Sequence, residues 1–416
     1  MEYIHRYQGD RVLKLLKQFP VVVLTGPRQA GKSTLLEKIK KPDWTYLNFD
    51  QRGLIEQAIR DPDLFAKNLK TPAIIDEAQK APNLFHSIKA EVDKNPEKKF
   101  ILSGSSNFQL MEGITETLAG RAAIAELFPF SVGELTLLKE PKVLSTILKV
   151  TNLSQLKKEL GEVKIVPLAG LYEKILWGGM PKIWSFNSLE ERHLWFENYR
   201  TTYIERDLRS LAQVGNLEDF QKFYQSIAFQ TANLLNLSNL ASDIGISVPT
   251  CRRYIDILRT SYQAFLLTPY SMNIGKRLVK TPKCYFLDTG VASFMHRYES
   301  EEALKASGKL GFLFETWVLG EVKKLLACMD HPPLPFFWKP HAAHEVDLVL
   351  EAGDRLYPME IKHAIRLTQN DWAGLELFLK TMKKRTVPFG IVWYRGESIL
   401  SLAKNIIALP LEYLWH

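Results

Sequence analysis

The feature that most constrains the fold is a glycine-rich loop near the N-terminus, GPRQAGKST at residues 26–34. It fits the pattern G-x-x-x-x-G-K-[ST], follows the apolar run FPVVVLTG and opens a helical pattern, which is the context that separates a phosphate-binding loop from a chance match. Its glycines let the backbone wrap around phosphates, and the helix N-terminus supplies N–H groups and a positive dipole end. The sequence therefore predicts a P-loop ATPase domain.

The residues of this loop have expected parts in holding ATP and Mg²⁺. Lys32 is expected to reach the β- and γ-phosphates, and the Ser33 hydroxyl is expected to ligate Mg²⁺. The predicted nucleotide-binding set is Gly26, Pro27, Arg28, Gln29, Ala30, Gly31, Lys32, Ser33 and Thr34.

Polar residues follow two later apolar runs and precede a third. In AIIDEAQ, Asp76 is expected to hold magnesium through water and Glu77 to polarise the attacking water, with a helix start as the alternative. In ILSGSSN, Ser105 or Ser106 is predicted to position the hydrolytic water, with a plain serine turn as the alternative. Arg121 is predicted to reach the γ-phosphate held by a neighbouring subunit, unless it is an exposed arginine. Its predicted role requires a homo-oligomer formed through the ATPase domain.

The order of apolar runs predicts an α/β fold in several domains, as the length of 416 residues also suggests. Residues 1–135 alternate near-continuous apolar strands with helices, as in a mainly parallel sheet. A helical lid or linker is predicted over 136–217, a helix-turn-helix region over 218–283 and a second α/β domain over 284–416. The expected strands are VVVLTG, TYLNFD, PAIIDEA, KFILSGSS and AAIAELF in the first domain, and LPFFWK, EVDLVLE, LYPMEIK, VPFGIVWY and IIALPLEYL in the last.

Composition and charge bound the partners only loosely. The net charge of +8 and pI near 9.1 hint at a polyanionic partner without establishing one. Cys251, Cys284 and Cys328 lack metal-ligand spacing and are expected to be reduced thiols in a cytoplasmic protein. Met1 leads into a charged stretch, so no signal peptide is expected, and no apolar run reaches the roughly 18 residues of a membrane helix.

Several long motifs resemble those of one known family. They are VVVLTGPRQAGKSTLL, IIDEAQKAPNLFHSIK, LAGRAAIAELFPFSVGEL, WGGMP, RRYIDILRTSYQAFLL, KTPKCYFLDTG and FETWVLGEV. Over nearly its whole length, the chain resembles the prokaryotic AAA-type ATPases of the AAA-fourteen type, which carry a C-terminal domain of long-unknown function. The resemblance implies an AAA-type ATPase core, a winged-helix middle domain and a restriction-endonuclease-like C-terminal domain.

The segment LSNLASDIGISVPTCRRYIDIL predicts two helices around Gly245, with Ser247 capping the second. GKRLVK further on is a candidate basic wing. Residues 236–283 hold seven Lys or Arg against two Asp, a local excess of five positive charges that suits a DNA backbone. An interdomain or protein-binding module is the alternative. The seven basic residues are Arg252, Arg253, Arg259, Lys276, Arg277, Lys280 and Lys283.

The segment HEVDLVLEAGDRLYPMEIKHA, at residues 344–364, predicts two strands joined by a tight turn at its Ala-Gly step. Because strand side chains alternate between faces, Asp347 shares a face with Glu345, and Glu360 shares one with Lys362. This turn would place Asp347 opposite Pro358, one diagonal step from Glu360. The hairpin therefore predicts convergence of Asp347, Glu360 and Lys362.

Two carboxylates this close repel each other unless a divalent cation lies between them. Glu315, in the helical pattern FLFETWVLGEV, is a further candidate ligand, so the predicted metal ligands are Glu315, Asp347 and Glu360. Lys362 is predicted to polarise a water or steady a phosphate oxygen. Glu…Asp…Glu-x-Lys resembles the restriction-endonuclease-like superfamily, except that Val346 stands where a proline often precedes the aspartate. The nearby histidines, interpreted as surface residues, are His341, His344 and His363.

Three functions remain open from the sequence. The first is an ATPase that couples ATP hydrolysis to DNA binding and Mg²⁺-dependent DNA cleavage by Asp347, Glu360 and Lys362. The second is an ATP-dependent DNA-binding or signalling switch whose C-terminal domain only binds. The third is a protein-remodelling AAA ATPase.

Overall fold

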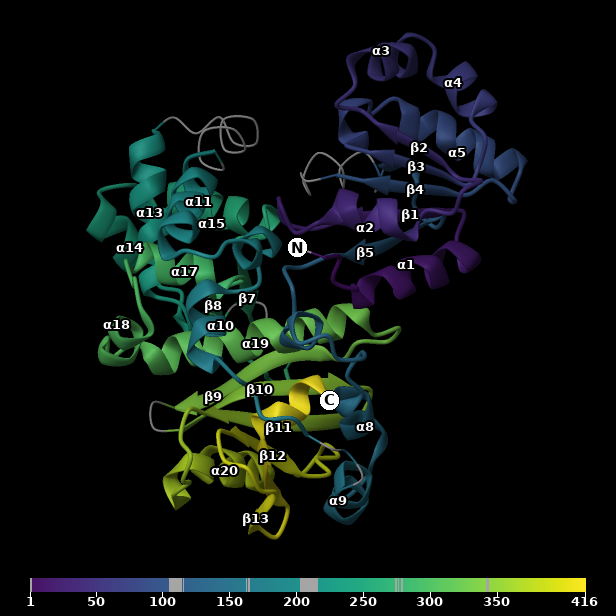
Figure 1. Cartoon of the computed structure of the whole chain (residues 1–416). Helices are drawn as coiled ribbons and strands as arrows, with labels where there is room; N and C mark the ends of the chain where they lie inside the picture. Colours follow the sequence, from purple (N-terminus) through teal and green to yellow (C-terminus); the bar gives the residue numbers. More distant parts are fainter. Residues whose placement is uncertain are drawn as a thin grey trace.

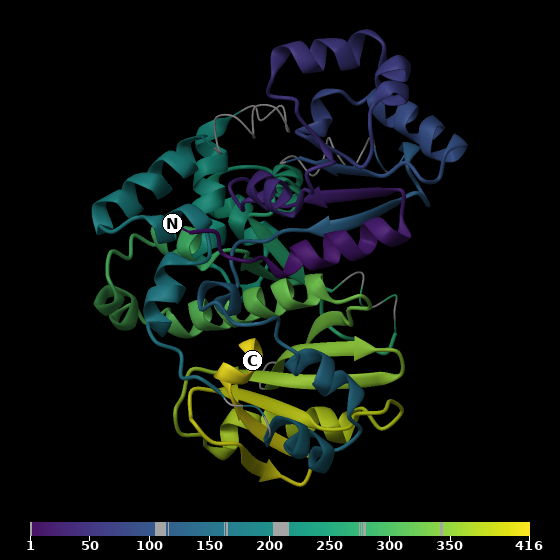
Figure 2. The same cartoon turned by 45° about the vertical axis from the view of Figure 1, so that its right-hand side comes forward.

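A computed structural model describes residues 2–104, 114, 116–161, 163, 165–202, 216–273, 275, 277, 280–341 and 344–416. Figures 1 and 2 show three lobes: a purple-to-blue N-terminal sheet with its helices, a teal-to-green helical region, and a green-to-yellow C-terminal sheet. The long helix α19 (Leu310–Cys328) lies between the last sheet and the other two lobes (Figure 1).

The N-terminal lobe is a parallel sheet of five buried or half-buried strands in the order β2-β3-β4-β1-β5. All five strands predicted here are confirmed. The strands are β1 (Val21–Thr25), β2 (Thr45–Asn48), β3 (Ala73–Asp76), β4 (Phe100–Ser103) and β5 (Ala122–Glu126). The helices are α1 (Tyr7–Gln18), α2 (Lys32–Ile39), α3 (Arg52–Arg60), α4 (Pro62–Asn68), η1 (Ala78–Lys80) and α5 (Leu84–Lys94).

The middle lobe joins helices to a small antiparallel sheet of order β6-β8-β7. The helix pair around Gly245 is confirmed, since Gly245 adopts φ 83° and the Ser247 side chain accepts from the Thr250 N–H. The strands are β6 (Asn233–Leu234), β7 (Ala264–Leu267) and β8 (Lys283–Phe286). The helices are α10 (Leu171–Trp177), η2 (Pro181–Ser185), α11 (Leu189–Thr202), α13 (Leu217–Phe229), α14 (Leu237–Ile244), α15 (Val248–Thr260), α17 (Thr289–Met295) and α18 (Glu301–Ala306).

The C-terminal lobe is a six-stranded mixed sheet of order β13-β14-β12-β11-β10-β9. The five strands predicted here are confirmed, whereas the short, partly exposed strand β13 was not predicted. The strands are β9 (Leu334–His341), β10 (His344–Ala352), β11 (Arg355–Lys362), β12 (Gly390–Tyr394), β13 (Leu400–Ala403) and β14 (Ile406–Pro410). Helices α20 (Ala373–Thr381), η4 (Gln369–Trp372) and η5 (Leu411–Trp415) accompany α19.

Two boundaries differ from those drawn on the sequence. Strand β8 pairs with β6 and β7, so a boundary at residue 283 cuts through the middle sheet. The expected lid also divides. Helix α7 (Val132–Leu135) precedes the expected lid. Helices α8 (Val143–Lys149) and α9 (Leu153–Gly161) belong to it, but they lie against the C-terminal sheet in both views (Figures 1 and 2). There the Tyr357 hydroxyl donates to the Leu148 carbonyl oxygen at 3.0 Å.

The three cysteines are free thiols, with Cys251 and Cys284 buried and Cys328 half-buried. Among the helices of the described ranges, none combines the length and the apolar character needed to cross a membrane.

Candidate nucleotide site and carboxylate cluster

The glycine-rich loop connects β1 to α2, which confirms its predicted strand-loop-helix setting. Gly26, Gln29 and Gly31 all adopt positive φ, of 146°, 60° and 92°. A Cβ on residue 26 would lie 2.1 Å from the carbonyl oxygen of Leu127, so only glycine fits there. The tight path of the loop therefore rests on backbone freedom at these positions.

Lys32 begins α2 with its side chain turned over the loop. It is only 7% exposed, and its Nζ donates to the carbonyl oxygens of Gly26 (2.9 Å) and Pro27 (2.8 Å). Ser33 and Thr34, which follow in the first helical turn, are exposed. The predicted phosphate-binding residues thus gather at the carboxyl end of β1.

Asp76 ends β3 beside this loop and is 1% exposed. Its Oδ2 accepts from the Tyr46 hydroxyl at 3.0 Å, and its Oδ1 accepts from the Ser103 hydroxyl and from the Glu77 N–H. Burial and Asp76 raise the pKa of Tyr46 well above its ordinary value, and Tyr46 also bonds Ser33. Tyr46 therefore joins the two predicted magnesium residues, Ser33 and Asp76.

Tyr46 was missed because it belongs to no recognised motif, and Ser103 was missed because only Ser105 and Ser106 of ILSGSSN were considered. Their only signal was position, since Tyr46 lies on β2 and Ser103 ends β4, the strands on either side of β3. Glu77 follows β3 in a left-handed conformation (φ 57°), and its Oε2 accepts from Gln79 Nε2 at 2.6 Å. The acidic pair thus stands at the strand end, as predicted.

The two remaining predictions for this lobe are Ser105 and Arg121. Ser105 and Ser106 lie outside the described residues. Arg121 precedes β5, and Val21 pairs with Ala122, so Arg121 lies at the sheet edge opposite the P-loop. There its Nε and Nη2 donate to the two carboxylate oxygens of Asp93 at 2.7 and 3.1 Å. Its action on a neighbouring subunit stays a prediction.

The nucleotide loop is bound to two distant parts of the chain. Arg6, 4% exposed, donates to the Ala30 carbonyl oxygen at 2.8 Å and pairs with Glu134 at 3.1 Å. From the middle lobe, the Tyr262 hydroxyl donates to Glu126 at 3.0 Å and contacts Thr25 Oγ1 at 3.3 Å. Thr25 is the residue before the loop, so the middle lobe directly contacts the nucleotide site.

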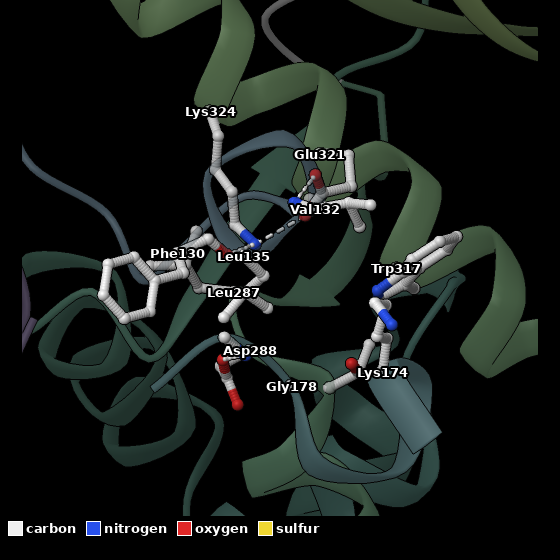
Figure 3. Close-up of a pocket in the computed structure, with 13 residues that line it drawn as sticks. Phe130, Val132, Leu135, Lys174, Gly178, Leu287, Asp288, Trp317, Glu321 and Lys324 are labelled. Atoms are coloured by element: carbon white, nitrogen blue, oxygen red, sulfur yellow. Dashed lines mark hydrogen bonds and ion pairs between the residues drawn. The ribbon is translucent and has the colours of Figure 1, made fainter. Parts of the chain in front are cut away.

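Where the three lobes meet, α19 contacts the chain that leaves the N-terminal sheet (Figure 3). Glu321 Oε2 accepts from the Val132 N–H at 2.8 Å, and Lys324 Nζ donates to the Phe130 carbonyl oxygen at 2.9 Å. Opposite, the buried Asp288 accepts from the Gly179 N–H at 2.8 Å, and its pKa is raised by burial. These groups border a cavity of only about 10 Å³. The junction is therefore closely packed.

In the C-terminal hairpin, the predicted register is wrong by two residues. Val349 pairs with Pro358 and Ala352 with Arg355, because the connecting loop is residues 353–354, with Gly353 at φ 61°. Leu348 pairs with Met359, so Asp347 faces Glu360 directly rather than diagonally. The two carboxyl groups consequently lie closer than the sequence predicted.

The structure gathers four carboxylates from three elements. Ligand oxygens of Glu315 (α19), Glu345 and Asp347 (β10) lie within 4.8 Å of one another. Glu360 on β11 hydrogen-bonds Asp347, and the Ile361 N–H donates to Asp347 Oδ2 at 2.8 Å. Of the predicted metal ligands, Glu315 and Asp347 meet in this set, whereas Glu345 takes the place expected of Glu360.

Glu360 is instead paired with Lys362, whose Nζ lies 3.0 Å from Glu360 Oε2. The backbone of α20 comes close here, since a Cβ on Gly374 would lie 2.6 Å from Glu360 Oε1. Burial and Asp347 raise the pKa of Glu360 well above its ordinary value. The charge of Lys362 acts in the opposite direction and lowers that pKa.

A lysine of the middle lobe enters the same cluster. Lys283, the first residue of β8, lies 3.0 Å from Glu315 Oε1 and also contacts Glu345 Oε1. Burial acts to lower the pKa of Lys283, but Glu315, Asp347 and Glu345 outweigh it and raise that pKa. Burial and Asp347 raise the pKa of Glu315 to about 7. Sequence reasoning missed this residue, because Lys283 was assigned to the basic surface.

The predicted basic surface is correspondingly smaller. Arg277, expected on a free wing, is paired with Glu351 at 2.7 Å and lies 4.4 Å from the centroid of the Tyr270 ring. Arg259 pairs with Asp256 at 3.0 Å. Arg252 and Arg253 are exposed and form no ion pair within the described ranges, and Lys280 is also exposed. Lys276 lies outside those ranges.

Neither His344 nor His363 belongs to the group of possible metal ligands found among the described residues. His344 is exposed, as predicted, and the His341 side chain lies outside the described part of the structure. His363 is half-buried rather than a surface residue. Its ring lies 5.0 Å from the Phe314 ring, and its Nε2 is 3.1 Å from Arg395 Nη1.

Comparison with known proteins identifies the kind of domain more clearly for the first lobe than for the other two. Residues 18–136 match a family described as "AAA domain". Residues 168–302 and 310–414 match two families described as domains of unknown function (DUF8612 and DUF4143). The N-terminal lobe is therefore similar in sequence to AAA domains. Neither of the other two descriptions names a winged helix or a nuclease fold.

Relatives over the whole chain carry no stated function. Uncharacterized proteins of Mycobacterium tuberculosis and Mycobacterium bovis are each 29% identical over 413 residues, covering 98% of this chain and 84% of their own. A Walker-type ATPase of Pyrococcus abyssi covers 71% of this chain and 96% of its own at 15% identity, with a TM-score of 0.46. That structural likeness is too distant to carry an argument.

Proposed function

We propose that this protein is a Mg²⁺-dependent ATPase that couples ATP hydrolysis to DNA binding. The observation that carries the proposal is the P-loop of an AAA-type domain standing beside Asp76 and Glu77 at the carboxyl edge of the sheet. The middle and C-terminal lobes supply the proposed DNA-binding parts.

The residues of the nucleotide site suit MgATP. Hydroxyl and carboxylate oxygens are donors that Mg²⁺ prefers, and Tyr46 links the hydroxyl of Ser33 to the carboxylate of Asp76. Mg²⁺, when bound, neutralises charge on the β- and γ-phosphates. In this proposal Lys32 binds those phosphates, and Glu77 orients the attacking water. Arg121 would complete the site of a neighbouring subunit in a homo-oligomer.

The middle lobe has the element order of a winged helix. Helices α13, α14 and α15 alternate with β6 and the β7–β8 pair, and the segment 268–282 between β7 and β8 takes the place of the wing. Arg252 and Arg253 lie on the exposed face of α15, the second helix of the turn. Exposed arginines on such a helix suit the phosphates of duplex DNA.

The C-terminal lobe supports a restriction-endonuclease-like fold. Helix α19, the β9–β10–β11 meander, α20 and β12 follow in order, and they bring Glu315, Asp347, Glu360 and Lys362 together. All ligands of this cluster are oxygen atoms, which suits Mg²⁺ or Mn²⁺. Cleavage of DNA by this lobe is therefore one candidate activity.

A second candidate is a switch whose C-terminal lobe binds DNA without cutting it. It is favoured by Lys283, which contacts two of the three grouped carboxylates. The two candidates share ATP hydrolysis and DNA binding, and they differ only in whether DNA is cleaved.

The test measures ATP hydrolysis and duplex DNA binding by the full chain across a salt series. Removing two phosphate contacts with Arg252→Ala/Arg253→Ala should weaken binding and reduce the slope of log K against log salt by about 2. The matched control is Lys404→Ala, an exposed lysine of the C-terminal lobe. Absence of ATP hydrolysis in the wild type, or an unchanged salt slope in the double variant, would refute the corresponding half of the proposal.

DNA cleavage is measured with the same protein preparations. DNA cut in Mg²⁺ by the wild type, and lost in Asp347→Ala, supports the nuclease. Intact DNA under every combination of metal and nucleotide supports the switch.

A further inference from the structure

Lys283 stands at the centre of the carboxylate cluster. Its Nζ lies 3.0 Å from Glu315 Oε1 and touches Glu345 Oε1, and its side chain is only 6% exposed. Those two carboxylates and Asp347 are the three whose oxygens lie within 4.8 Å of one another. The Tyr285 hydroxyl closes the same side by donating to Glu315 Oε1 at 2.7 Å. In this conformation the ammonium group is the cation that the cluster holds.

A divalent metal ion and this ammonium group exclude each other. A metal ion bound by carboxylates lies roughly 2.0–2.6 Å from their oxygens. The Lys283 Nζ already contacts Glu315 and Glu345, so both cations would compete for the same carboxylates. At such separations two positive charges also repel strongly in a buried site. Metal binding therefore requires Lys283 to leave.

The cluster is close to electrical balance with lysines alone. Glu345 Oε2 accepts from Lys339 at 2.8 Å, and Glu360 pairs with Lys362 at 3.0 Å. Three ammonium groups, with Lys283, thus face four carboxyl groups, of which Glu360 and Asp347 share a hydrogen bond. Lys283 therefore gives the cluster the charge compensation that a metal ion would otherwise provide.

The position of Lys283 depends on the middle lobe. Its backbone is held in the middle sheet, where residue 283 pairs with Leu234 on one side and Leu267 on the other. Glu315 and Glu345 belong to α19 and β10 of the C-terminal lobe. Displacement of the middle sheet from the C-terminal sheet would withdraw the ammonium group from the cluster.

We propose that Lys283 is a tethered cation that holds the carboxylate cluster in place of a divalent metal ion, and that a metal ion enters when the middle lobe withdraws it. The inference rests on the proposed restriction-endonuclease-like character of the C-terminal lobe. It adds an internal competitor that ties metal entry to the docking of the two lobes.

The experiment measures Mn²⁺ binding to the nucleotide-free full chain by titration with electron paramagnetic resonance of the free ion. Lys283→Met keeps the length of the side chain and removes its charge. We expect this variant to bind one Mn²⁺ at least 10-fold more tightly than the wild type, and Asp347→Asn in the same background to abolish the gain. Lys339→Met is the matched control, since Lys339 contacts the outer oxygen of Glu345, and it should raise the affinity less than 3-fold.

If the Lys283→Met substitution impairs folding, the stability of the variant provides the test instead. If Lys283→Met melts at a lower temperature or is unfolded in EDTA, Mn²⁺ should restore at least half of the loss, whereas the wild type should not respond. A Lys283→Met chain that is folded but binds Mn²⁺ no better than the wild type overturns the proposal. A destabilised Lys283→Met chain whose stability Mn²⁺ does not restore also overturns the proposal.

Failure of this inference is distinguishable from failure of the proposed function. Wild-type ATP hydrolysis and DNA binding, measured on the same preparation, test the proposed function and do not depend on Lys283 exchange. Tight Mn²⁺ binding without DNA cleavage by Lys283→Met would uphold the exchange and refute the nuclease.

Discussion

The nucleotide loop and the carboxylate cluster are built in opposite ways. The loop is a run of consecutive residues in which backbone conformation does most of the work, with Gly26 and Gly31 at positive φ. The cluster is a set of side chains from β8, α19, β10 and β11, separated by up to 79 positions between Lys283 and Lys362. The residues of the loop belong to one lobe, whereas the cluster takes its carboxylates from the C-terminal lobe and Lys283 from the middle lobe.

The largest effect that tests this comparison is loss of ATP hydrolysis in Lys32→Ala. The Lys32 ammonium group is expected to contact the charge that develops on the phosphates, and removing one such contact lowers kcat by at least about 100-fold. Lys32 donates to the local carbonyl oxygens of Gly26 and Pro27, and we expect the melting temperature to change little when these bonds are lost. Steady-state ATP hydrolysis measures the change in kcat, and a thermal melt measures the melting temperature.

Lys40→Ala is the control, because Lys40 is exposed at the end of the same helix. A kcat for Lys32→Ala within 5-fold of the wild type would contradict the assignment of the loop.

The second effect is loss of stability in Gly26→Ala. The new Cβ would meet the Leu127 carbonyl oxygen at 2.1 Å, and φ of 146° disfavours any L side chain. Strain of this kind costs at least about 2 kcal/mol, measured as the free energy of unfolding in urea. Gly53→Ala, in helix α3 with no atom near its Cβ, should be neutral or stabilising. Equal stability of the two variants would show that the loop is looser than described.

This contrast also explains what the sequence predicted and what it did not. The loop, Asp76 and Glu77 were predicted because they belong to short contiguous motifs whose residue types follow from backbone and phosphate chemistry. The hairpin was predicted, but its register was wrong, because the choice between neighbouring turn positions moves every pair on the strands. No such uncertainty affects a strand-loop-helix motif.

Lys283 shows the limit most clearly. Counting charges along residues 236–283 placed it with Arg252 and Arg253 on a DNA-binding surface, although it is buried among carboxylates. The sequence gives the sum of charges but not the face of the lobe on which each one lies. Tyr46 was missed for the same reason, since its partner Asp76 is 30 positions away.

The third effect is a loss of stability in Arg277→Met, which separates arginines with a structural role from those that bind DNA. Arg277 pairs with Glu351 and packs over the Tyr270 and Phe336 rings, with its side chain 13% exposed. Arg277→Met should lower the free energy of unfolding by about 1–2 kcal/mol, less than for an isolated buried pair because Arg385 still contacts Glu351. DNA affinity should stay within 2-fold. Weaker DNA binding at unchanged stability would instead show that Arg277 belongs to the DNA-binding surface of the protein.

The smallest effect is a pH dependence confined to the C-terminal lobe. His363 lies beside Arg395 and between the Tyr172 and Phe314 rings, and burial followed by the Arg395 charge lowers its pKa to about 4. In the unfolded chain its pKa is about 6.5. Between these pH values His363 binds a proton in the unfolded state but not in the folded state, so the free energy of unfolding falls as pH drops from 6.5 towards 4.

Because the ring is only half-buried, solvent screening reduces this contribution to about 1 kcal/mol. His363→Phe removes the titrating group, so the variant should gain about 1 kcal/mol relative to the wild type between pH 7 and pH 4.5, measured by urea unfolding. His86→Phe, at an exposed histidine of the N-terminal lobe, should show no such relative gain. An equal gain in both variants would mean that the acid sensitivity is spread over the whole chain, and the contrast between a locally built loop and a docked C-terminal site would lose this support.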